Sequence, residues 1–355
     1  MIVHQWVPSA HQGDAVGDQA RRLRDLCRGW GHESEIFAIH VDRALESDIY
    51  SWEEPEARDA DVTILHFATA SPMSAAFGRL PGARILAYHN VTPARFFAPY
   101  DAGMARTSAV ARQELAALAG RVDLATGASA FSCAELDELG FAETRVLPIL
   151  VDIERLRRAP PVPALDRLLQ DDFVNILFVG RIAPQKRIDH HVHLAQHYMR
   201  YVDAYYRFIF VGRYDVVPGY FEAVQAMVQT FRIPADRFWF TGAVPEDELA
   251  AYYRHAHAYV SLSEHEGFCV PLVEAMSMDV PVLAYAGTAV PETLGGAGVS
   301  FRPKDLEMAA ELLGGLIYDE PFRQGVLAGQ RARVRDFDRR RIEPAFLKIL
   351  ETVGS

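Results

Sequence analysis

The chain has 355 residues, of which 50% are hydrophobic and 23% are charged, and its formal net charge is −11. That length allows two domains, each with its own core, and the acidic total disfavours general nucleic-acid binding, which needs a basic surface. The sequence has no run of 18 apolar residues, no pattern of a secretory leader, and only three widely spaced cysteines. We therefore expect a soluble, cytoplasmic protein that does not depend on disulfide bonds.

The first half of the chain alternates strand-like and helix-like segments. Residues 18–33 have helical spacing with a glycine stop. The short apolar runs are residues 1–7, 34–41, 60–68, 83–90, 122–129 and 143–150. Short buried strands separated by helices predict right-handed crossover units in a parallel sheet. Residues 1–160 are therefore predicted to form one Rossmann-like domain.

A break follows in "RRAPPVPALDRLLQDD", residues 157–172, which is rich in proline and charge. We interpret residues 161–172 as a linker. The alternation then restarts with the apolar runs 173–181, 206–214, 237–244, 257–264 and 281–287. These runs predict an α/β fold with a second doubly wound domain over residues 173–336, and residues 343–353 have the pattern of a final helix.

Glycine and arginine residues follow the predicted strands of the second domain. The pairs Gly180-Arg181 and Gly212-Arg213 come directly after two strands, and Gly242 follows a third. In open parallel sheets, ligands bind beyond the carboxyl ends of the strands. We therefore expect several loops of this domain to converge on one ligand site.

The stretch "EHEGFCVPLVE" carries two acids, Glu266 and Glu274, on either side of a predicted helix start. Proline favours the first position of a helix, so Pro271 indicates where the helix begins. The exposed backbone N–H groups at such a start bind anions, while carboxylates accept hydrogen bonds from vicinal sugar hydroxyls. This arrangement suits a sugar joined to a nucleotide diphosphate.

Two cations, Arg181 and Lys186, lie in "FVGRIAPQKRIDH" near another predicted helix start. The chain has only three lysines, which makes Lys186 conspicuous. Two such cations would neutralise a diphosphate leaving group as it gains charge. Because they supply that charge, we expect neither a metal ion nor a cofactor.

These motifs resemble the retaining family 4 glycosyltransferases of the GT-B fold. The resemblance rests on two glutamates separated by seven residues in "EGFCVPLVE", together with "VGRIAPQKRID", "FTGAVPEDELAAYYRHA" and "MSMDVPVLAYAGTAVPETLGGAG", and covers most of residues 173–305. It implies two Rossmann-like domains with a cleft between them. It also implies that a last helix, at about residues 337–355, packs back onto the first domain.

The resemblance also implies residue roles. In the first domain, "YHNVTP" supplies a histidine that faces the donor sugar, and "HQGDAVGDQ" resembles a glycine-containing loop that lines the cleft. The implied catalytic residues are His89, Arg181, Lys186 and Glu266. The implied donor-binding residues are Gly13, Gly180, Gly212, Arg213, Gly242, Ala243, Gly267, Phe268, Cys269, Val270, Pro271, Leu272 and Glu274.

The resulting functional expectation is a metal-independent retaining transferase that moves a hexose-type sugar to a glycan or lipid-linked acceptor. The donor is GDP-mannose or a UDP-hexose, and the family context is bacterial cell-envelope or exopolysaccharide synthesis at the inner face of the membrane, with peripheral membrane contact left open. The alternatives are a non-catalytic nucleotide-sugar-binding partner subunit, or an epimerase or hydrolase on the same fold. Measuring free nucleotide with and without acceptors separates the three.

Ordinary structural roles compete with some of these interpretations. The two glutamates could be surface acids that favour a helix start, and we interpret Glu264 as a solvated neighbour. A set of four histidines, His190, His191, His193 and His197, lacks the acid of a "HExxH" metal motif and is interpreted as a polar helix face. The arginines of the first helix, Arg21, Arg22, Arg24 and Arg28, are interpreted as a solvated face rather than a lipid-binding one.

Overall fold

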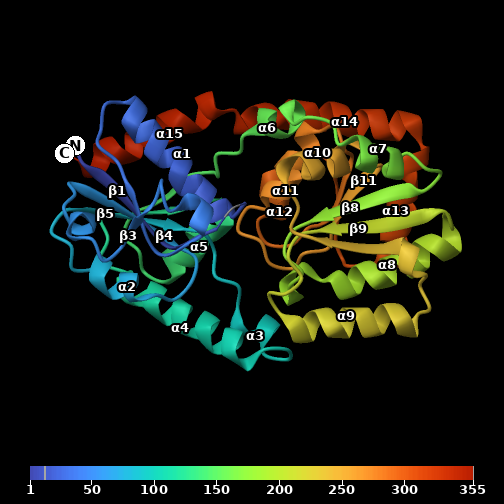
Figure 1. The fold of residues 1–355 in the computed structure, drawn as a ribbon, viewed down its shortest axis with the longest axis horizontal. Helices are drawn as coiled ribbons and strands as arrows, with labels where there is room; N and C mark the ends of the chain where they lie inside the picture. Colours follow the sequence, from blue (N-terminus) through green and yellow to red (C-terminus); the bar gives the residue numbers. More distant parts are fainter. Residues whose placement is uncertain (12, 355) are drawn as a thin grey trace. The chain divides into compact units, whose positions relative to one another are not determined.

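The computed structural model describes residues 1–11 and 13–354, and the chain divides into two compact units. Unit 1 comprises residues 1–95, 102–150 and 339–354, and unit 2 comprises Phe96–Asp101 and Val151–Asp338. Figure 1 shows that each unit is a parallel sheet with helices on its two faces. The predicted α/β class with two doubly wound domains is confirmed.

Unit 1 contains a seven-stranded sheet with the order β3-β2-β1-β4-β5-β6-β7. All of its pairings are parallel, as the short apolar runs predicted. The chain order reverses between β1 and β4, and this is the topological switch point of the sheet. The strands are β1 (Val3–Ala10), β2 (Ile36–Val41), β3 (Tyr50–Ser51), β4 (Val62–Phe67), β5 (Ala83–Tyr88), β6 (Leu124–Gly127) and β7 (Thr144–Val146).

The helices of unit 1 cover both faces of this sheet. Successive strand residues point to opposite sides, so both faces carry apolar side chains that helices bury. In β4, Ile64 belongs to one buried cluster and Leu65 to the other. The helical segments are α1 (Ala15–Gly29), α2 (Pro72–Phe77), α4 (Ala102–Leu118), α5 (Ala130–Glu138), α15 (Arg339–Val353) and the 3-10 turns η1 (Arg43–Leu45) and η2 (Pro55–Arg58). The short helix α3 (Ala94–Phe97) lies where the chain leaves unit 1.

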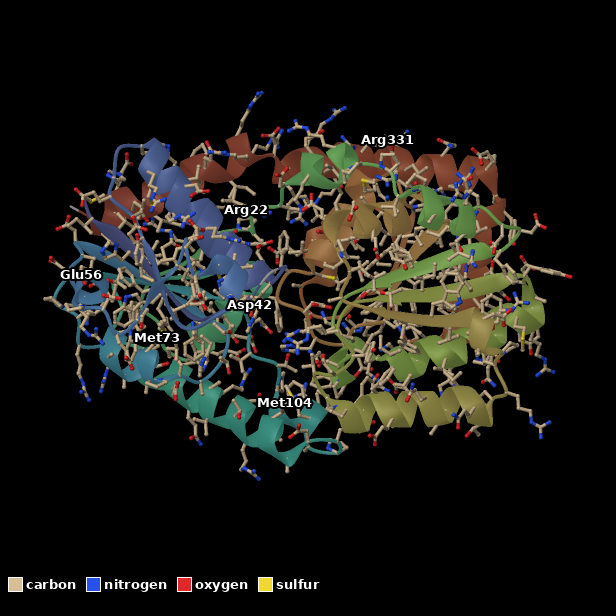
Figure 2. The ribbon with its side chains drawn as sticks, in the orientation of Figure 1. Arg22, Asp42, Glu56, Met73, Met104 and Arg331 are labelled. Carbon is tan, nitrogen blue, oxygen red and sulfur yellow. The ribbon has the colours of Figure 1, made fainter. Side chains whose placement is uncertain are left out.

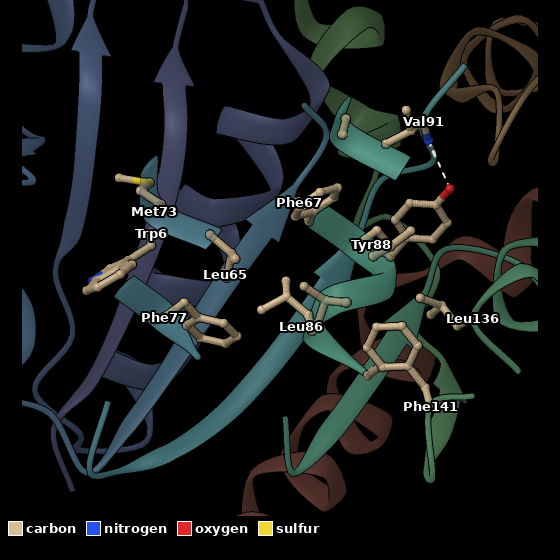
Figure 3. Close-up of a cluster of buried hydrophobic side chains, with 14 of the residues drawn as sticks. Trp6, Leu65, Phe67, Met73, Phe77, Leu86, Tyr88, Val91, Leu136 and Phe141 are labelled. Carbon is tan, nitrogen blue, oxygen red and sulfur yellow. Dashed lines mark hydrogen bonds between the residues drawn. The ribbon is translucent and has the colours of Figure 1, made fainter. Parts of the chain in front are cut away.

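One buried cluster joins the sheet to α2, α4 and α5. Trp6, Leu65, Phe67 and Phe77 pack together in it, and the Tyr88 hydroxyl accepts a hydrogen bond from the Val91 backbone N–H at 3.0 Å (Figure 3). The other cluster joins α1 and α15 to the opposite face. Apolar residues at helical spacing in α15 enter this second cluster, so the last helix packs within unit 1; they are Ile342, Phe346, Ile349 and Leu350.

Unit 2 contains a six-stranded parallel sheet with the order β10-β9-β8-β11-β12-β13. In local numbering this is 3-2-1-4-5-6, the order of dinucleotide-binding Rossmann domains, and its switch point lies between β8 and β11. The strands are β8 (Val174–Val179), β9 (Tyr206–Val211), β10 (Phe238–Gly242), β11 (Ala258–Ser261), β12 (Val282–Tyr285) and β13 (Val299–Phe301).

Helices also flank both faces of the unit 2 sheet (Figure 1). They are α6 (Ile153–Arg158), α7 (Pro163–Leu169), α8 (Ile188–Tyr201), α9 (Pro218–Thr230), α10 (Glu246–Arg254), α11 (Val270–Ser277), α12 (Val290–Leu294), α13 (Leu306–Tyr318) and α14 (Glu320–Val334). The 3-10 turns are η3 (Pro184–Lys186), η4 (Ala235–Arg237) and η5 (Arg335–Phe337).

The unit boundaries differ from those expected from the sequence. Residues 161–172, expected to be a linker, contain α7 and belong to unit 2, which begins at Val151. Leu169 is only 2% exposed, and its carbonyl accepts a hydrogen bond from the Asn175 side chain at 2.9 Å. The prolines suggested an extended connection. Pro163 instead occupies the first turn of α7, a position that proline favours.

A second difference is the segment Phe96–Asp101, which lies in unit 2 although both of its flanking segments lie in unit 1. The Tyr100 ring meets the Tyr220 ring edge-on, with 5.1 Å between the centroids. A Cβ atom at Gly219 would lie only 3.0 Å from the Tyr100 carbonyl oxygen, so the two backbones approach closely. Nothing in the local sequence pattern predicts this exchange.

Candidate functional site

The switch point of unit 2 places two loops next to each other. One loop follows β8 and contains Arg181 and Lys186, and the other follows β11 and contains Glu266. Because β8 and β11 are adjacent parallel strands, their carboxyl ends meet at the same edge of the sheet. The two motifs that sequence reasoning singled out therefore form one region.

Glycines with positive φ angles stand at the carboxyl ends of β8, β9 and β10: Gly180, Gly212 and Gly242. The Gly180 N–H donates to the Val211 carbonyl at 2.8 Å, and the Gly212 N–H donates to the Gly242 carbonyl at 2.9 Å. A Cβ atom at Gly212 would lie 2.3 Å from the Gly180 carbonyl oxygen, and the φ angle of Gly212 is +141°. These glycines thus shape the edge through backbone contacts with one another.

Lys186 and Glu266 form an ion pair at the centre of this edge. The Lys186 Nζ atom lies 2.6 Å from Glu266 Oε1, and the two side chains are 18% and 9% exposed. The backbone of Glu266 is fixed as well, because its N–H donates to Thr288 Oγ1 at 2.8 Å while the Thr288 hydroxyl donates back to its carbonyl at 2.9 Å. The acid and the cation expected to face one ligand are therefore in contact.

Helix α11 begins one residue before the proline that predicted it. Cys269 caps the helix in the left-handed region, at φ 73°, which is strained for a residue other than glycine. Within the residues that the structure describes, the backbone N–H groups of Phe268, Cys269 and Val270 donate no hydrogen bond. Three successive unpaired donors at a helix start make a site for an anion.

Glu274, in the same helix, is held by groups from other elements. Its Oε2 atom accepts a hydrogen bond from the Tyr253 hydroxyl at 3.0 Å, and its Oε1 atom lies 3.7 Å from the Arg155 guanidinium. Burial, followed by the nearby charge of Glu274, raises the pKa of Tyr253 well above its usual value. Tyr253 therefore stays protonated and orients the carboxylate.

The remaining predicted residues differ in how exposed they are to solvent. Arg181 and Ala243 are exposed, and Arg213 pairs with Asp215 at 2.9 Å on an exposed turn. Phe268, Cys269 and Leu272 are buried side chains, so any contact they make with a ligand would come from their backbone. Burial raises the pKa of the Cys269 thiol well above its usual value, which makes this cysteine a packing residue. Gly267 is partly buried within the loop.

The interpretation of Glu264 as a solvated neighbour is wrong. Its carboxylate forms ion pairs with Arg187 at 3.0 Å and with Lys304 at 2.9 Å, and Lys304 also donates to the Leu262 carbonyl at 2.9 Å. Burial alone would raise the pKa of Glu264, but the hydrogen bonds and charges of Lys304 and Arg187 outweigh burial and lower it. The network ties the loops after β8, β11 and β13 together behind the Lys186–Glu266 pair.

Two helix faces also differ from their sequence interpretation. His191 is fully buried rather than on a polar face, and it packs edge-on against Phe178 and Phe210. Arg24, in α1, is 5% exposed and pairs with Asp48 at 2.8 Å rather than facing solvent. The neighbouring Arg22 of α1 donates to the Leu150 carbonyl, and Figure 2 labels it on that helix. These side chains are bound within their own unit because apolar packing of the helices carries them inward.

In unit 1, His89 follows β5 directly and Gly13 follows β1, both at the carboxyl edge of that sheet. Burial lowers the pKa of His89 to about 4, and its Nε2 atom lies 2.9 Å from Nδ1 of His66. Gly13 has a φ of +72°, and a Cβ atom added there would meet nothing within 4 Å, so only its backbone conformation calls for glycine. Gln12, in the same predicted loop, lies outside the described residues.

Sequence reasoning missed five residues that hold the site: Arg155, Tyr253, Thr288, Arg187 and Lys304. For Lys304 and Arg187 a signal existed, since lysines are rare in this chain and Arg187 adjoins Lys186. The other three come from distant segments without a local pattern. Only the packing of helices α6 and α10 against α11 brings Arg155 and Tyr253 to Glu274.

Comparisons with known proteins show which family this region resembles. Residues 166–332 match the family model described as glycosyl transferases group 1. The serotype-specific mannosyltransferase WbdA of Escherichia coli is 28% identical over 169 residues, which is 48% of this chain, and the match spans only 20% of that relative. The D-inositol 3-phosphate glycosyltransferase of Frankia alni is 31% identical over 195 residues, covering 53% of this chain and 47% of the relative.

Solved structures resemble the whole chain. HepE of Anabaena, in complex with UDP-glucose, superposes with a TM-score of 0.78 at 15% identity and covers 99% of this chain and 100% of its own. Sucrose-phosphate synthase from Thermosynechococcus elongatus gives a TM-score of 0.75 at 16% identity, covering 99% of both chains. In the described residues, no helix combines the length and apolarity needed to cross a bilayer. The chain therefore has the GT-B fold seen in glycosyltransferases, and its residues 166–332 match the glycosyl transferases group 1 family model.

Proposed function

We propose that the protein is a retaining glycosyltransferase that moves a hexose-type sugar from a nucleotide-diphosphate donor to a glycan or lipid-linked acceptor. One observation carries the proposal: the loop after β11 combines the buried Glu266 carboxylate, paired to Lys186 at 2.6 Å, with three unpaired backbone N–H groups. Carboxylates accept hydrogen bonds from sugar hydroxyls, and backbone N–H groups at a helix start bind phosphate. One short loop thus offers groups for both parts of a nucleotide-sugar.

Each donor group has a proposed partner in unit 2. The diphosphate binds the N–H groups of Phe268, Cys269 and Val270 and the cations Arg181 and Lys186, while Glu266 accepts hydroxyls of the sugar. Glu274, whose carboxylate is held by the Tyr253 hydroxyl and the Arg155 guanidinium, accepts the ribose hydroxyls. The glycine turns at Gly180, Gly212 and Gly242 keep the edge narrow enough for backbone contact.

The proposed reaction exchanges one bond at the anomeric carbon. The acceptor oxygen forms a bond there on the face from which the diphosphate leaves, the carbon–oxygen bond to the diphosphate breaks, and a phosphate oxygen takes the acceptor proton. The protein positions the reactants and stabilises the charge that develops on the leaving group. Arg181 and Lys186 supply this positive charge, which supports catalysis without a metal ion or cofactor.

The relatives suggest which donors to test first. WbdA and the O-antigen chain mannosyltransferase B of Escherichia coli carry mannosyl transfer in their names, while HepE was solved with UDP-glucose. We therefore propose GDP-mannose as the first donor and UDP-glucose as the second. The same relatives favour an acceptor in bacterial cell-envelope polysaccharide synthesis, with the enzyme on the cytoplasmic side of the membrane.

The test is to incubate the full chain with each donor, with and without mannose-terminated oligosaccharides, and to measure released nucleoside diphosphate and product. We expect acceptor-dependent release that a chelator leaves unchanged, and an NMR anomeric configuration in the product that matches the donor. Inverted product would refute retention, and loss of turnover in chelator would refute metal independence. Binding of a donor without any turnover would instead support a non-catalytic partner, and acceptor-independent turnover would support a hydrolase or epimerase.

A further inference from the structure

A hydrogen-bonded series of three polar side chains, two of them fully buried and the third partly buried, crosses the switch point of unit 1. Gln5 in β1 is 0% exposed, and its Oε1 atom lies 2.7 Å from Nε2 of His66, which is also 0% exposed and lies in the adjacent strand β4. His66 Nδ1 in turn lies 2.9 Å from Nε2 of His89, and the two rings are nearly parallel. The backbone N–H of His89 also donates to the Phe67 carbonyl at 2.9 Å, which fixes the backbone behind the ring.

The imidazoles of His66 and His89 are both neutral at pH 7. Burial lowers the pKa of His89 to about 4, and burial together with the neighbouring His89 lowers the pKa of His66 well below its usual value. A neutral imidazole has one N–H donor and one lone-pair acceptor, and a partner on one nitrogen decides which is which. The orientation of Gln5 therefore determines the proton positions in both rings.

The proton positions follow from the Gln5 carbonyl oxygen, which can only accept. His66 consequently donates from Nε2 to Gln5, and its Nδ1 atom carries the lone pair. His89 must then donate from Nε2 to that lone pair, so the lone pair of His89 is on Nδ1. This Nδ1 atom is buried and has no hydrogen-bond partner in the described residues, as is also true of the Gln5 amide nitrogen.

We propose that Gln5 and His66 are positioning residues that hold His89 in the neutral Nε2–H form, so that its Nδ1 atom accepts a hydrogen bond from a ligand hydroxyl. A buried acceptor without a partner is costly in a folded protein, and a hydroxyl donor would satisfy it. A phosphate oxygen would not, because it also accepts. The His89 Nδ1 atom thus favours a ligand hydroxyl, and the assignment of that hydroxyl to a sugar rests on the proposed function.

A spectroscopic test determines which nitrogens of His66 and His89 carry protons, without any assay of activity. The full-length protein is labelled with ¹⁵N-histidine, and the His66 and His89 resonances are assigned from the spectra of the His66→Asn and His89→Gln variants. We expect an unprotonated Nδ1 and a protonated Nε2 in both residues at pH 7. A protonated Nδ1 in His89 would overturn the proposal, and so would an unchanged His89 signal in Gln5→Met.

A kinetic test adds the functional consequence. We expect Gln5→Met to lower kcat roughly tenfold, the scale of one lost hydrogen bond, with a smaller change in the KM of the donor. The matched control is Gln330→Met, which removes an equally buried glutamine that bonds Val282 and Val280 in unit 2 and should lower stability while leaving kcat near its starting value. If Gln5→Met and Gln330→Met lose kcat equally, Gln5 has only a structural role.

Replacement of His66 completes the design. In His66→Asn the amide oxygen can take the place of the Nδ1 acceptor, whereas His66→Leu offers none, so we expect activity to survive better in the former at similar melting temperature. Equal activity in the two variants would contradict the proposal. Absence of turnover with every donor would refute the proposed function, but the histidine spectra would still decide the orientation of the chain.

Discussion

The two sheets share a strand order around their switch points, yet the polar groups at those points differ in charge. In unit 2 the groups are ionised and paired, as in Lys186 with Glu266 and Glu264 with Lys304. In unit 1 the polar side chains are neutral: Gln5 and His66 are fully buried, and His89 beside them is partly buried. Ionised pairs suit a ligand that carries phosphate, and neutral imidazoles suit one that carries hydroxyls. The fold supplies two equivalent edges, and the side chains give each its chemistry.

Gly212 in unit 2 and Gly13 in unit 1 also differ in how closely other atoms approach them. In unit 2, a Cβ atom at Gly212 would collide with the backbone of Gly180, whereas in unit 1 a Cβ atom at Gly13 would meet nothing within 4 Å. Backbone cannot move aside as a flexible side chain can. Gly212 therefore tolerates a side chain less well than Gly13, and the first of the four predictions below tests this contrast.

The largest effect is expected for Gly212→Ala. The clash with a carbonyl oxygen and the unfavourable φ should lower the free energy of unfolding by about 4 kcal/mol. Gly13→Ala, the matched change in unit 1, should cost about 1 kcal/mol, because only its positive φ is unfavourable. Urea unfolding measures both, and similar losses would show that the two edges are equally tight.

The next effect concerns the buried ion pair. Lys186→Ala removes a proposed contact to the leaving group and leaves Glu266 without its cation, so transfer should fall by roughly 10² or more. Lys348→Ala is the control, because Lys348 is an exposed lysine of α15. Steady-state kinetics with the best donor measures both variants, and near-normal transfer by Lys186→Ala would discredit its assignment.

A smaller effect on stability is expected when the ion pair between Lys304 and Glu264 is broken. Lys304→Met breaks an ion pair whose lysine is 12% exposed, and it should lower the free energy of unfolding by about 2 kcal/mol. It should also raise the KM of the donor, because Glu264 helps to fix the loop that carries Glu266. A donor KM unchanged from that of the unaltered protein would separate this network from the binding site.

The smallest effect is the dependence of the free energy of unfolding on pH. The pKa of His89 in unit 1 and of His191 in unit 2 is lowered by burial from 6.5 to about 4. Between those values the unfolded chain binds protons that the folded chain does not, so stability falls as the pH falls from 6.5 towards 4. Each histidine contributes about 1 kcal/mol per pH unit in this window. Urea unfolding of His89→Gln from pH 7 to 5 should show a flatter dependence than the unaltered protein.

Much of the fold was predictable because its signals are local. Short apolar runs marked most strands of both sheets, and Pro271 marked the start of α11 to within one residue. The pairing of Lys186 with Glu266 was also within reach, since parallel strands bring their following loops to one edge. For the strands and the helix start, a pattern within a dozen residues was sufficient, whereas the Lys186–Glu266 pairing also depends on β8 and β11 being neighbours.

Contacts between distant segments could not be predicted in this way. Tyr253 and Arg155 reach Glu274 only because α10 and α6 pack beside α11, and Gln5 meets His66 only because β1 and β4 are neighbours. The burial of His191 was missed because a run of histidines looks polar regardless of which side faces the sheet. Boundaries failed for the same reason, since α7 is held by packing that its sequence does not display.

The route of the chain limits how the molecule can be taken apart. It leaves unit 1 after Arg95, returns at Ala102, leaves again after Leu150 and returns at Arg339. A single cut, or a shortened gene that begins or stops at one of these positions, would deprive one unit of a strand, a helix or the Phe96–Asp101 segment. Separate expression would need two new joints for unit 1 and one for unit 2, so neither unit corresponds to a single continuous stretch of the polypeptide.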